Sequence, residues 1–165
     1  MSSVFTGIIL LTEGFVNSYG LLGTFVIAVL ESFIFPVPTA VMIAPATALG
    51  LDPLLTTIVA TIGSVMGAVV GYFLGKRLGH PVAIRLFKKK NVDKVEKWYE
   101  KYGAWAVLIA AFSPVPFKVF TWASGIFELE LKPFLVACVI GRLAQFAIAA
   151  YVGDIFGPTI LTWFA

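Results

Sequence analysis

Long apolar stretches make up most of the chain, and two of them run unbroken for the length of a membrane-spanning helix. These are Asp52–Gly75 and Lys132–Asp154, and the only formal charge between their ends is Arg142. A helix needs roughly 20 mostly apolar residues to cross a bilayer. The pattern therefore predicts two spanning helices, the second of which carries a cation near the middle of its length.

Two further apolar stretches, Leu21–Leu51 and Ala104–Phe127, are each interrupted by Pro-Val-Pro. A proline in a helix interior costs about 3 kcal/mol or more, so each stretch is expected to break there. The second stretch is also too short to cross a bilayer twice. We therefore expect two re-entrant helical hairpins, whose irregular tips line a polar cavity near the midplane. The residues assigned to these tips are Pro36, Pro38, Pro114, Pro116 and Gly125.

The composition supports a membrane protein. Of the 165 residues, 59% are hydrophobic and 13% are charged, whereas a soluble domain carries about 25% charged residues. The predicted fold class is an all-α integral membrane protein, multi-pass in a cell membrane, with a single membrane domain over residues 1–165. The lone Cys138 excludes an intramolecular disulfide, and the lone His80 cannot build a metal site. Since no nucleophile–base pair is present either, we expect no cofactor and no enzymatic activity.

The basic residues are concentrated in the middle of the chain. Nine of the twelve lie between Lys76 and Lys101, and the first 75 residues contain none. The positive-inside rule places this central segment in the cytoplasm and both termini outside. Within it, Asn91–Lys101 predicts an amphipathic interfacial helix with Trp98 as its anchor, although a solvated connector would show a similar composition. We expect no nucleic-acid binding, because the basic run alternates with acids between two apolar halves.

The chain repeats itself at a spacing of 78 residues. Pro-Val-Pro at 36–38 recurs at 114–116, and three glycines recur at the same spacing. Because the central loop reverses the chain, the two units are expected to lie in opposite orientations, as an inverted repeat. The predicted parts are an N-terminal interfacial helix (1–18), repeat 1 (19–79), a cytoplasmic basic loop with an amphipathic helix (80–101) and repeat 2 (102–157).

Glycines mark one face of each predicted spanning helix. Small residues at this spacing let two membrane helices approach closely, so that dispersion forces can hold them together. The residues assigned to helix packing are Gly63, Gly67, Gly71 and Gly75 in the first helix, and Gly141 and Gly153 in the second.

These motifs resemble a known family. The stretches Glu31–Pro38 and Phe112–Lys118, followed by Gly125 and by Gly141-Arg142, are similar to those of the DedA/VTT membrane proteins, also called SNARE-associated Golgi proteins, and most of all to their short, YqaA-like branch. The resemblance implies transport of lipids across a bilayer, with proton coupling through membrane-embedded charged residues. One departure is that Ala40 occupies the place where the family often has a glutamate.

Three charged residues are the candidate substrate-binding or transport site. Lys118 is either a phosphate-contacting cation or a lysine that reaches the interface. Arg142 is either a planar partner for a phosphate or carboxylate or half of a structural ion pair, for which Glu31 is the candidate. Glu31 in turn is either a proton carrier or a static counter-ion.

The favoured function is a flippase- or scramblase-like transporter that moves an anionic lipid, such as a polyprenyl phosphate or a phospholipid, between leaflets. An ion-coupled transporter of a small solute and a non-transporting membrane assembly factor are the alternatives. The expected partners are membrane lipids, with protons or another coupling ion, and a homodimer is plausible because two spans and two hairpins are few to seal a path.

Overall fold

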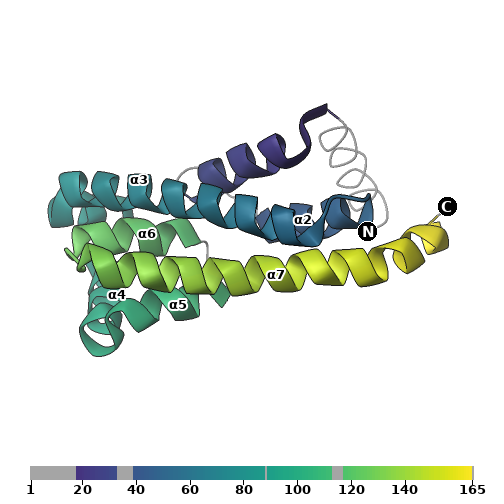
Figure 1. Cartoon of the computed structure of the whole chain (residues 1–165). Helices are drawn as coiled ribbons and strands as arrows, with labels where there is room; N and C mark the ends of the chain where they lie inside the picture. Colours follow the sequence, from purple (N-terminus) through teal and green to yellow (C-terminus); the bar gives the residue numbers. More distant parts are fainter. Residues whose placement is uncertain (1–17, 33–38, 88, 113–116, 165) are drawn as a thin grey trace.

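Two long antiparallel helices form the frame of the protein (Figure 1). The structure is a computed structural model that describes residues 18–32, 39–87, 89–112 and 117–164, and every regular element in these ranges is a helix. Helix α3 spans Pro53–Phe87 and helix α7 spans Leu131–Phe164. Their parts Pro53–Gly79 and Leu131–Gly157 are long and apolar enough to cross a membrane by length and composition. The sequence predicted both spans, with starts within one residue of those observed and with C-terminal ends at Gly75 and Asp154, before Gly79 and Gly157.

Four shorter helices cover this frame in two pairs. The helix Ser18–Ser32 and α2 (Thr39–Ala48) lie along the half of the frame where α3 begins. Helices α5 (Ala104–Phe112) and α6 (Phe117–Ile126) lie along the other half (Figure 1). The predicted tip residues Pro36, Pro38, Pro114 and Pro116, and most of the predicted N-terminal helix, lie outside the described residues.

The two helices of each pair pack on different long helices. The first helix of a pair packs on the long helix that follows it in the chain: Ser18–Ser32 contacts α3, and α5 contacts α7. The second helix crosses over, so that α2 packs on α7 and α6 packs on α3. The two halves of the chain therefore hold each other in place, and neither is a separate bundle.

Backbone geometry recurs at the spacing of 78 residues seen in the sequence. The turn after α2 contains Gly50 with φ 104°, and the corresponding turn after α6 contains Glu128 with φ 50°. The same backbone hydrogen bonds close both turns: Leu51 N–H donates to Ala46 O at 3.2 Å, and Leu129 N–H donates to Ser124 O at 2.9 Å. Glycine adopts this left-handed backbone without strain whereas glutamate does not. The second turn therefore keeps its shape at an energetic cost.

Glycines allow the crossing helices to touch backbone to backbone. A Cβ on Gly63 would lie 2.6 Å from the carbonyl oxygen of Phe25. One on Gly75 would overlap the backbone of Trp122 in α6, and one on Gly153 would overlap that of Ala44 in α2. These last two contacts occupy corresponding places in the repeat. Of the other glycines assigned to packing, Gly67 meets Val29, Gly71 meets Thr121, and Gly141 is buried.

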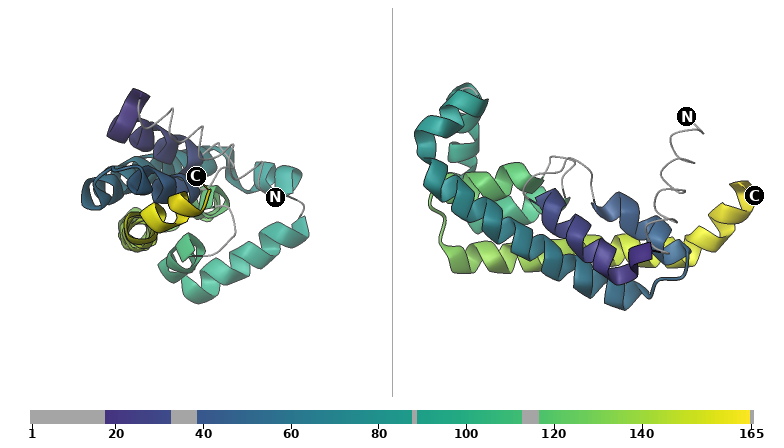
Figure 2. Two further views of the ribbon diagram at one scale, coloured as in Figure 1. Left: turned by 90° about the vertical axis from the view of Figure 1, so that its right-hand side faces the viewer. Right: turned by 90° about the horizontal axis from the view of Figure 1, so that it is seen from above.

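A kink at Gly79 turns the chain away from the direction of α3. Gly79 has φ 68° and ψ 178°, after which residues 80–87 are again helical. The sequence predicted a cytoplasmic basic loop with an amphipathic helix over residues 80–101, and in the structure residues 80–87 are helical. Pro81 lacks a backbone N–H and is well tolerated in the first turn of a helix, so it begins a new helix after the glycine. Helix α4 (Lys89–Tyr102) then contains the predicted amphipathic segment, and it is seen lengthwise where α7 is seen nearly end-on (left view of Figure 2).

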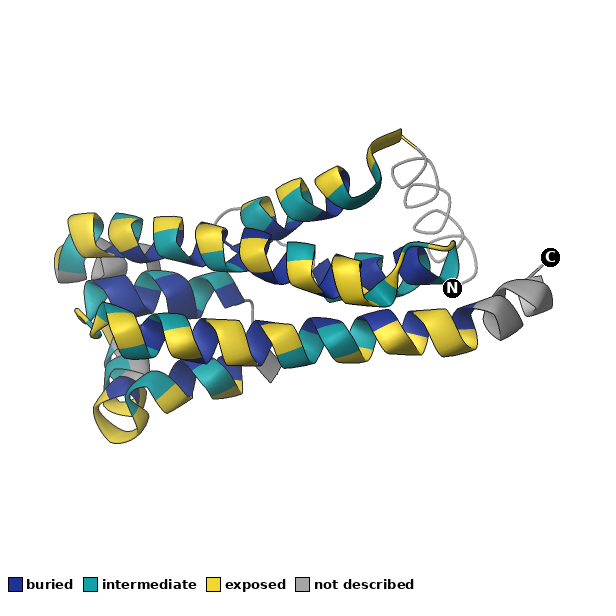
Figure 3. Cartoon of the chain, viewed as in Figure 1, coloured by how far each residue is buried: buried dark blue, intermediate teal, exposed yellow. Residues whose placement is uncertain are grey.

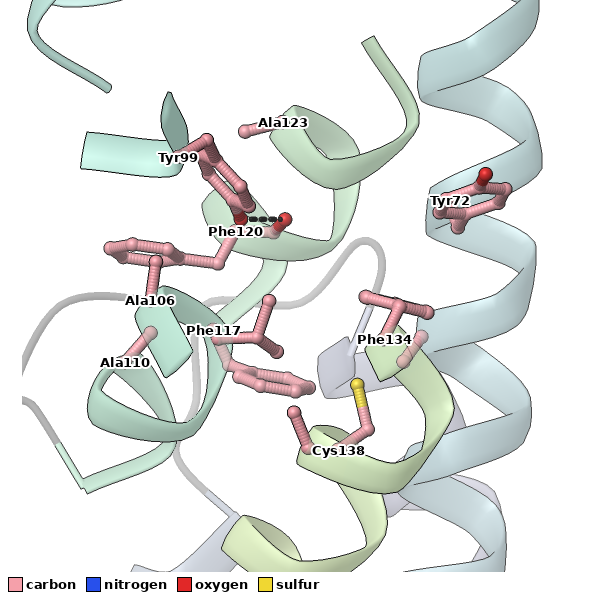
Figure 4. Close-up of a cluster of buried hydrophobic side chains, with 12 residues drawn as sticks. Tyr72, Tyr99, Ala106, Ala110, Phe117, Phe120, Ala123, Phe134 and Cys138 are labelled. Carbon is pink, nitrogen blue, oxygen red and sulfur yellow. Dashed lines mark hydrogen bonds between the residues drawn. The ribbon is translucent and has the colours of Figure 1, made fainter. Parts of the chain in front are cut away.

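Burial divides the surface of the long helices into an inner and an outer face (Figure 3). The main apolar core lies between α3, α4, α5, α6 and α7, and includes Phe120, Phe134 and Cys138 (Figure 4). The outer face of α3 exposes large apolar side chains such as Ile62, Met66 and Val70. An exposed apolar stripe of this length fits contact with lipid tails rather than with water.

Candidate functional site

A buried ion pair joins the two halves of the chain near the middle of α7. Arg142 Nη2 lies 3.3 Å from Glu31 Oε1, and the two residues are only 2% and 9% exposed. Glu31 is one residue before the end of the helix Ser18–Ser32. Taking two charges out of water costs several kcal/mol per ion, so a buried pair needs further hydrogen bonds.

The hydrogen bonds around the pair come from both sides. Thr39, the first residue of α2, donates from Oγ1 to Glu31 Oε2 at 2.6 Å. On α7, Arg142 Nη1 donates to Gln145 Oε1 at 2.9 Å. Thr39 and Arg142 therefore donate to different oxygens of the Glu31 side chain.

Two aromatic rings complete the surroundings of the guanidinium group. Arg142 Cζ lies 3.9 Å from the ring centre of Phe117, the first residue of α6, and 5.2 Å from that of Phe146. A cation over an aromatic face within about 6 Å is stabilised by the ring, more so when water is excluded. Within the described part of the chain, Arg142 Nε has no hydrogen-bond partner. The guanidinium therefore keeps hydrogen-bonding capacity that Glu31 and Gln145 do not use.

A second set of polar contacts ties the same region to α3 and α6. Ser32 Oγ lies 2.7 Å from Ser64 Oγ in α3, and both side chains are fully buried. Thr121 Oγ1 in α6 donates to the backbone carbonyl of Ser32 at 3.2 Å. The C-terminal end of Ser18–Ser32 and the starts of α2 and α6 therefore meet between the long helices.

The structure brings some of the candidate residues predicted from the sequence together and places another elsewhere. Glu31 and Arg142 are brought together, and Lys118 is half-buried next to Phe117, with its carbonyl accepting a bond from Thr121 at 2.9 Å. Gly125 lies in the α6–α3 contact against Tyr72, away from this pair. Among the described residues, no group of three His, Cys, Asp or Glu side chains is placed to hold a metal ion.

Sequence reasoning missed the neutral members of the site. Thr39 follows directly after the first Pro-Val-Pro, and Gln145 lies three residues after Arg142, which puts it on the same face of a helix. Both positions could have been found by asking which polar residues reach the two charges. Ser32 and Ser64 gave no such signal, because serine is common in membrane helices.

Comparison with known proteins assigns the chain to a family. The model of the VTT domain matches residues 35–155, which include Thr39, Phe117, Arg142 and Gln145. The chain belongs to the DedA/VTT family. It is a membrane protein, and two of the relatives that it matches are named as membrane proteins.

Several relatives that this DedA/VTT chain matches are named as uncharacterized proteins. The chain is 34% identical over 130 residues to an uncharacterized protein of Methanocaldococcus jannaschii, an alignment that covers 79% of this chain and 81% of that one. It is 27% identical to the uncharacterized membrane protein YbfM of Bacillus subtilis, over 89% of this chain and 96% of YbfM. A shorter match, 32% identical over 41% of this chain and 34% of the relative, is to undecaprenyl phosphate transporter A of Bacillus subtilis. No solved structure matches the chain.

Replacing Thr39 by valine tests how strongly the DedA/VTT chain depends on the bond to Glu31. A hydrogen bond to a charged group contributes about 1.5–3 kcal/mol. We expect Thr39→Val to lower the free energy of unfolding in detergent by about 2 kcal/mol. Thr57→Val is the matched control, because Thr57 is also buried and donates to Pro53 O of its own helix, at 2.7 Å. Equal losses in the two variants would contradict a special role for Thr39.

Proposed function

We propose that the protein moves an anionic lipid headgroup between leaflets, with Arg142 as the group that binds the phosphate. The observation that carries the proposal is the buried Arg142, which lies about half-way along a helix long enough to cross the membrane. A cation at that depth is costly and usually faces a transport path. The similarity to a relative named as an undecaprenyl phosphate transporter also supports a polyprenyl phosphate or a phospholipid as the substrate.

In this proposal Glu31 is the counter-ion that holds Arg142 when no substrate is bound. The headgroup phosphate replaces the Glu31 carboxylate, so that the guanidinium is paired at every stage. The planar guanidinium can bind a phosphate through two parallel N–H groups, and Nε is already without a partner among the described residues. The contact with Phe117 keeps the guanidinium plane fixed during the exchange.

The proposed path runs between two re-entrant hairpins in an inverted repeat. The recurring turns at Gly50 and Glu128 and the crossed packing of α2 and α6 support this arrangement. Lys118 would be a second cation on the same route. The central basic segment would face the cytoplasm, in keeping with the distribution of charge.

The decisive experiment is reconstitution of the full chain in liposomes. Two probes are incorporated, a fluorescent phosphatidylglycerol and a fluorescent polyprenyl phosphate, and a membrane-impermeant quencher reports how much of each probe is in the outer leaflet. We expect faster exchange of at least one probe than in empty vesicles, and loss of the increase in Arg142→Gln. Lys132→Gln removes an exposed cation from the first turn of the same helix, and should exchange the probe like wild type.

Exchange of both probes at the rate of empty vesicles, by protein that keeps its native unfolding temperature, would refute the proposal. Uptake of a water-soluble solute without lipid exchange would indicate a small-solute transporter instead. Full lipid exchange by Arg142→Gln would show that the path lies elsewhere.

A further inference from the structure

Helix α4 has a surface that the proposed transport path does not use. It lies across the direction of α7 at one end of the protein (Figure 2), and packs on α3, α5 and α6. If α7 spans the membrane, a helix in this orientation lies along the membrane surface. Its exposed residues include Lys89, Lys97, Trp98, Lys101 and Tyr102.

The exposed residues of α4 combine positive charge with interfacial aromatic rings. Lys97 and Lys101 are one helical turn apart, and so are Trp98 and Tyr102, whose ring centres are 5.6 Å apart. Lys101 Nζ lies 5.1 Å from the ring centre of Tyr102. The helix has five lysines against three acids, and the exposed Lys76 and Arg77 lie at the end of the spanning part of α3 nearby. Aromatic rings prefer the headgroup level, and clustered lysines are attracted by anionic lipids.

The opposite face of α4 is joined to α6 through Tyr99. The Tyr99 hydroxyl donates to Phe120 O at 2.8 Å (Figure 4). It also lies 2.9 Å from Ser124 Oγ. Tyr99 is 6% exposed, and burial raises the pKa of its phenol, so the hydroxyl keeps its proton and remains a donor. Phe120 lies one helical turn after Phe117, the ring that stacks on Arg142. Tyr99 and the Arg142 guanidinium are therefore connected by one hydrogen bond, one turn of α6 and the ring of Phe117.

We propose that α4 is a docking surface for the anionic headgroups of the adjacent leaflet, and that Tyr99 transmits this docking to α6. The lysines supply the attraction, and the pair Trp98–Tyr102 holds the helix at the headgroup level. Docked α4 keeps α6 pressed onto the main core, whereas in a neutral membrane α4 and α6 open more often. The lipid composition of one leaflet thus sets how often the region beside Arg142 opens.

The native Cys138 provides a measure of this opening. It is the only cysteine of the chain, it is fully buried, and it belongs to the same core cluster as Tyr99 and Phe120. A membrane-permeant maleimide reacts with it only when the core around α6 opens. The rate can be measured on the full chain in nanodiscs of phosphatidylcholine alone and in nanodiscs with phosphatidylglycerol. Since this readout needs no transport, it is independent of the proposed function.

We expect labelling to be about fivefold slower in the anionic nanodiscs, the effect of roughly one lysine near an anionic surface. The double variant K97Q/K101Q should lose most of this difference and label like wild type in phosphatidylcholine. Tyr99→Phe should label faster in both lipids and lose the difference. K132Q removes an exposed cation from the first turn of α7, a helix that begins at the same end of the molecule as α4, and should keep the difference. Equal wild-type rates in both lipids, or loss of the difference in K132Q as well, would overturn the proposal.

Discussion

Replacing Gly75 by leucine is expected to separate α6 from α3 and to cost about 3 kcal/mol or more of the free energy of unfolding. A Cβ at this position would overlap the backbone carbonyl of Trp122. Backbone atoms cannot rotate out of the way as the end of a flexible side chain can, so α6 itself has to move. Inserting extra atoms into a well-packed contact typically costs about 1–3 kcal/mol, and more where the backbone must shift. Equilibrium unfolding of the full chain in detergent, followed by tryptophan fluorescence, measures the loss.

A leucine elsewhere on the same helix provides the control. Val70 is 41% exposed on the outer face of α3, so Val70→Leu should change the free energy of unfolding by less than about 0.5 kcal/mol. Gly153→Leu should resemble Gly75→Leu, because Gly153 meets the backbone of Ala44 at the corresponding crossing. If Gly75→Leu were as stable as Val70→Leu, the close approach of α3 and α6 would be wrong.

The crossings could be predicted from the sequence only in part. The four-residue spacing from Gly63 to Gly75 indicated a face for close packing, but not which helix would occupy it. The structure divides that face: Gly63 and Gly67 meet Ser18–Ser32, whereas Gly71 and Gly75 meet α6 from the other half of the chain. The spacing of glycines along one helix does not show which helix packs against them. The change of partner along α3, from Ser18–Ser32 to α6, therefore could not be predicted from the sequence.

For the candidate site as well, the sequence pointed to individual residues but not to their contacts. Glu31 and Arg142 were singled out because a charge in an apolar stretch is costly wherever it lies. Their pairing was one of several alternatives, since 111 residues separate them in the chain. Thr39 and Phe117 received no role, although each begins a helix beside the pair. A threonine or a phenylalanine can lie in a membrane helix without the cost of a charge. These residue types therefore did not indicate a functional position in the sequence.

Removing one member of the Glu31–Arg142 pair is expected to have a larger effect than removing both. Arg142→Leu leaves the Glu31 carboxylate buried with Thr39 as its remaining donor among the described residues. Glu31→Leu leaves the guanidinium with Gln145 and the two rings. Breaking a buried pair from either side costs about 3–5 kcal/mol, because a charge remains without compensation. Both single variants should therefore unfold at much lower denaturant concentrations than wild type.

The double variant separates stability from function. When both charges are replaced by leucine, no buried charge remains, and such replacements are often neutral or stabilising. We expect the free energy of unfolding of E31L/R142L to return to within about 1 kcal/mol of wild type, a coupling of about 5 kcal/mol or more between the two positions, since each single replacement costs at least about 3 kcal/mol. Lipid exchange should nevertheless be absent, because the group that binds the phosphate is gone.

Asp154→Leu, at an exposed position of the same helix, should leave both measurements unchanged. Additive losses in the double variant would mean that the two charges do not interact, and normal lipid exchange by a stable E31L/R142L would remove Arg142 from the transport path.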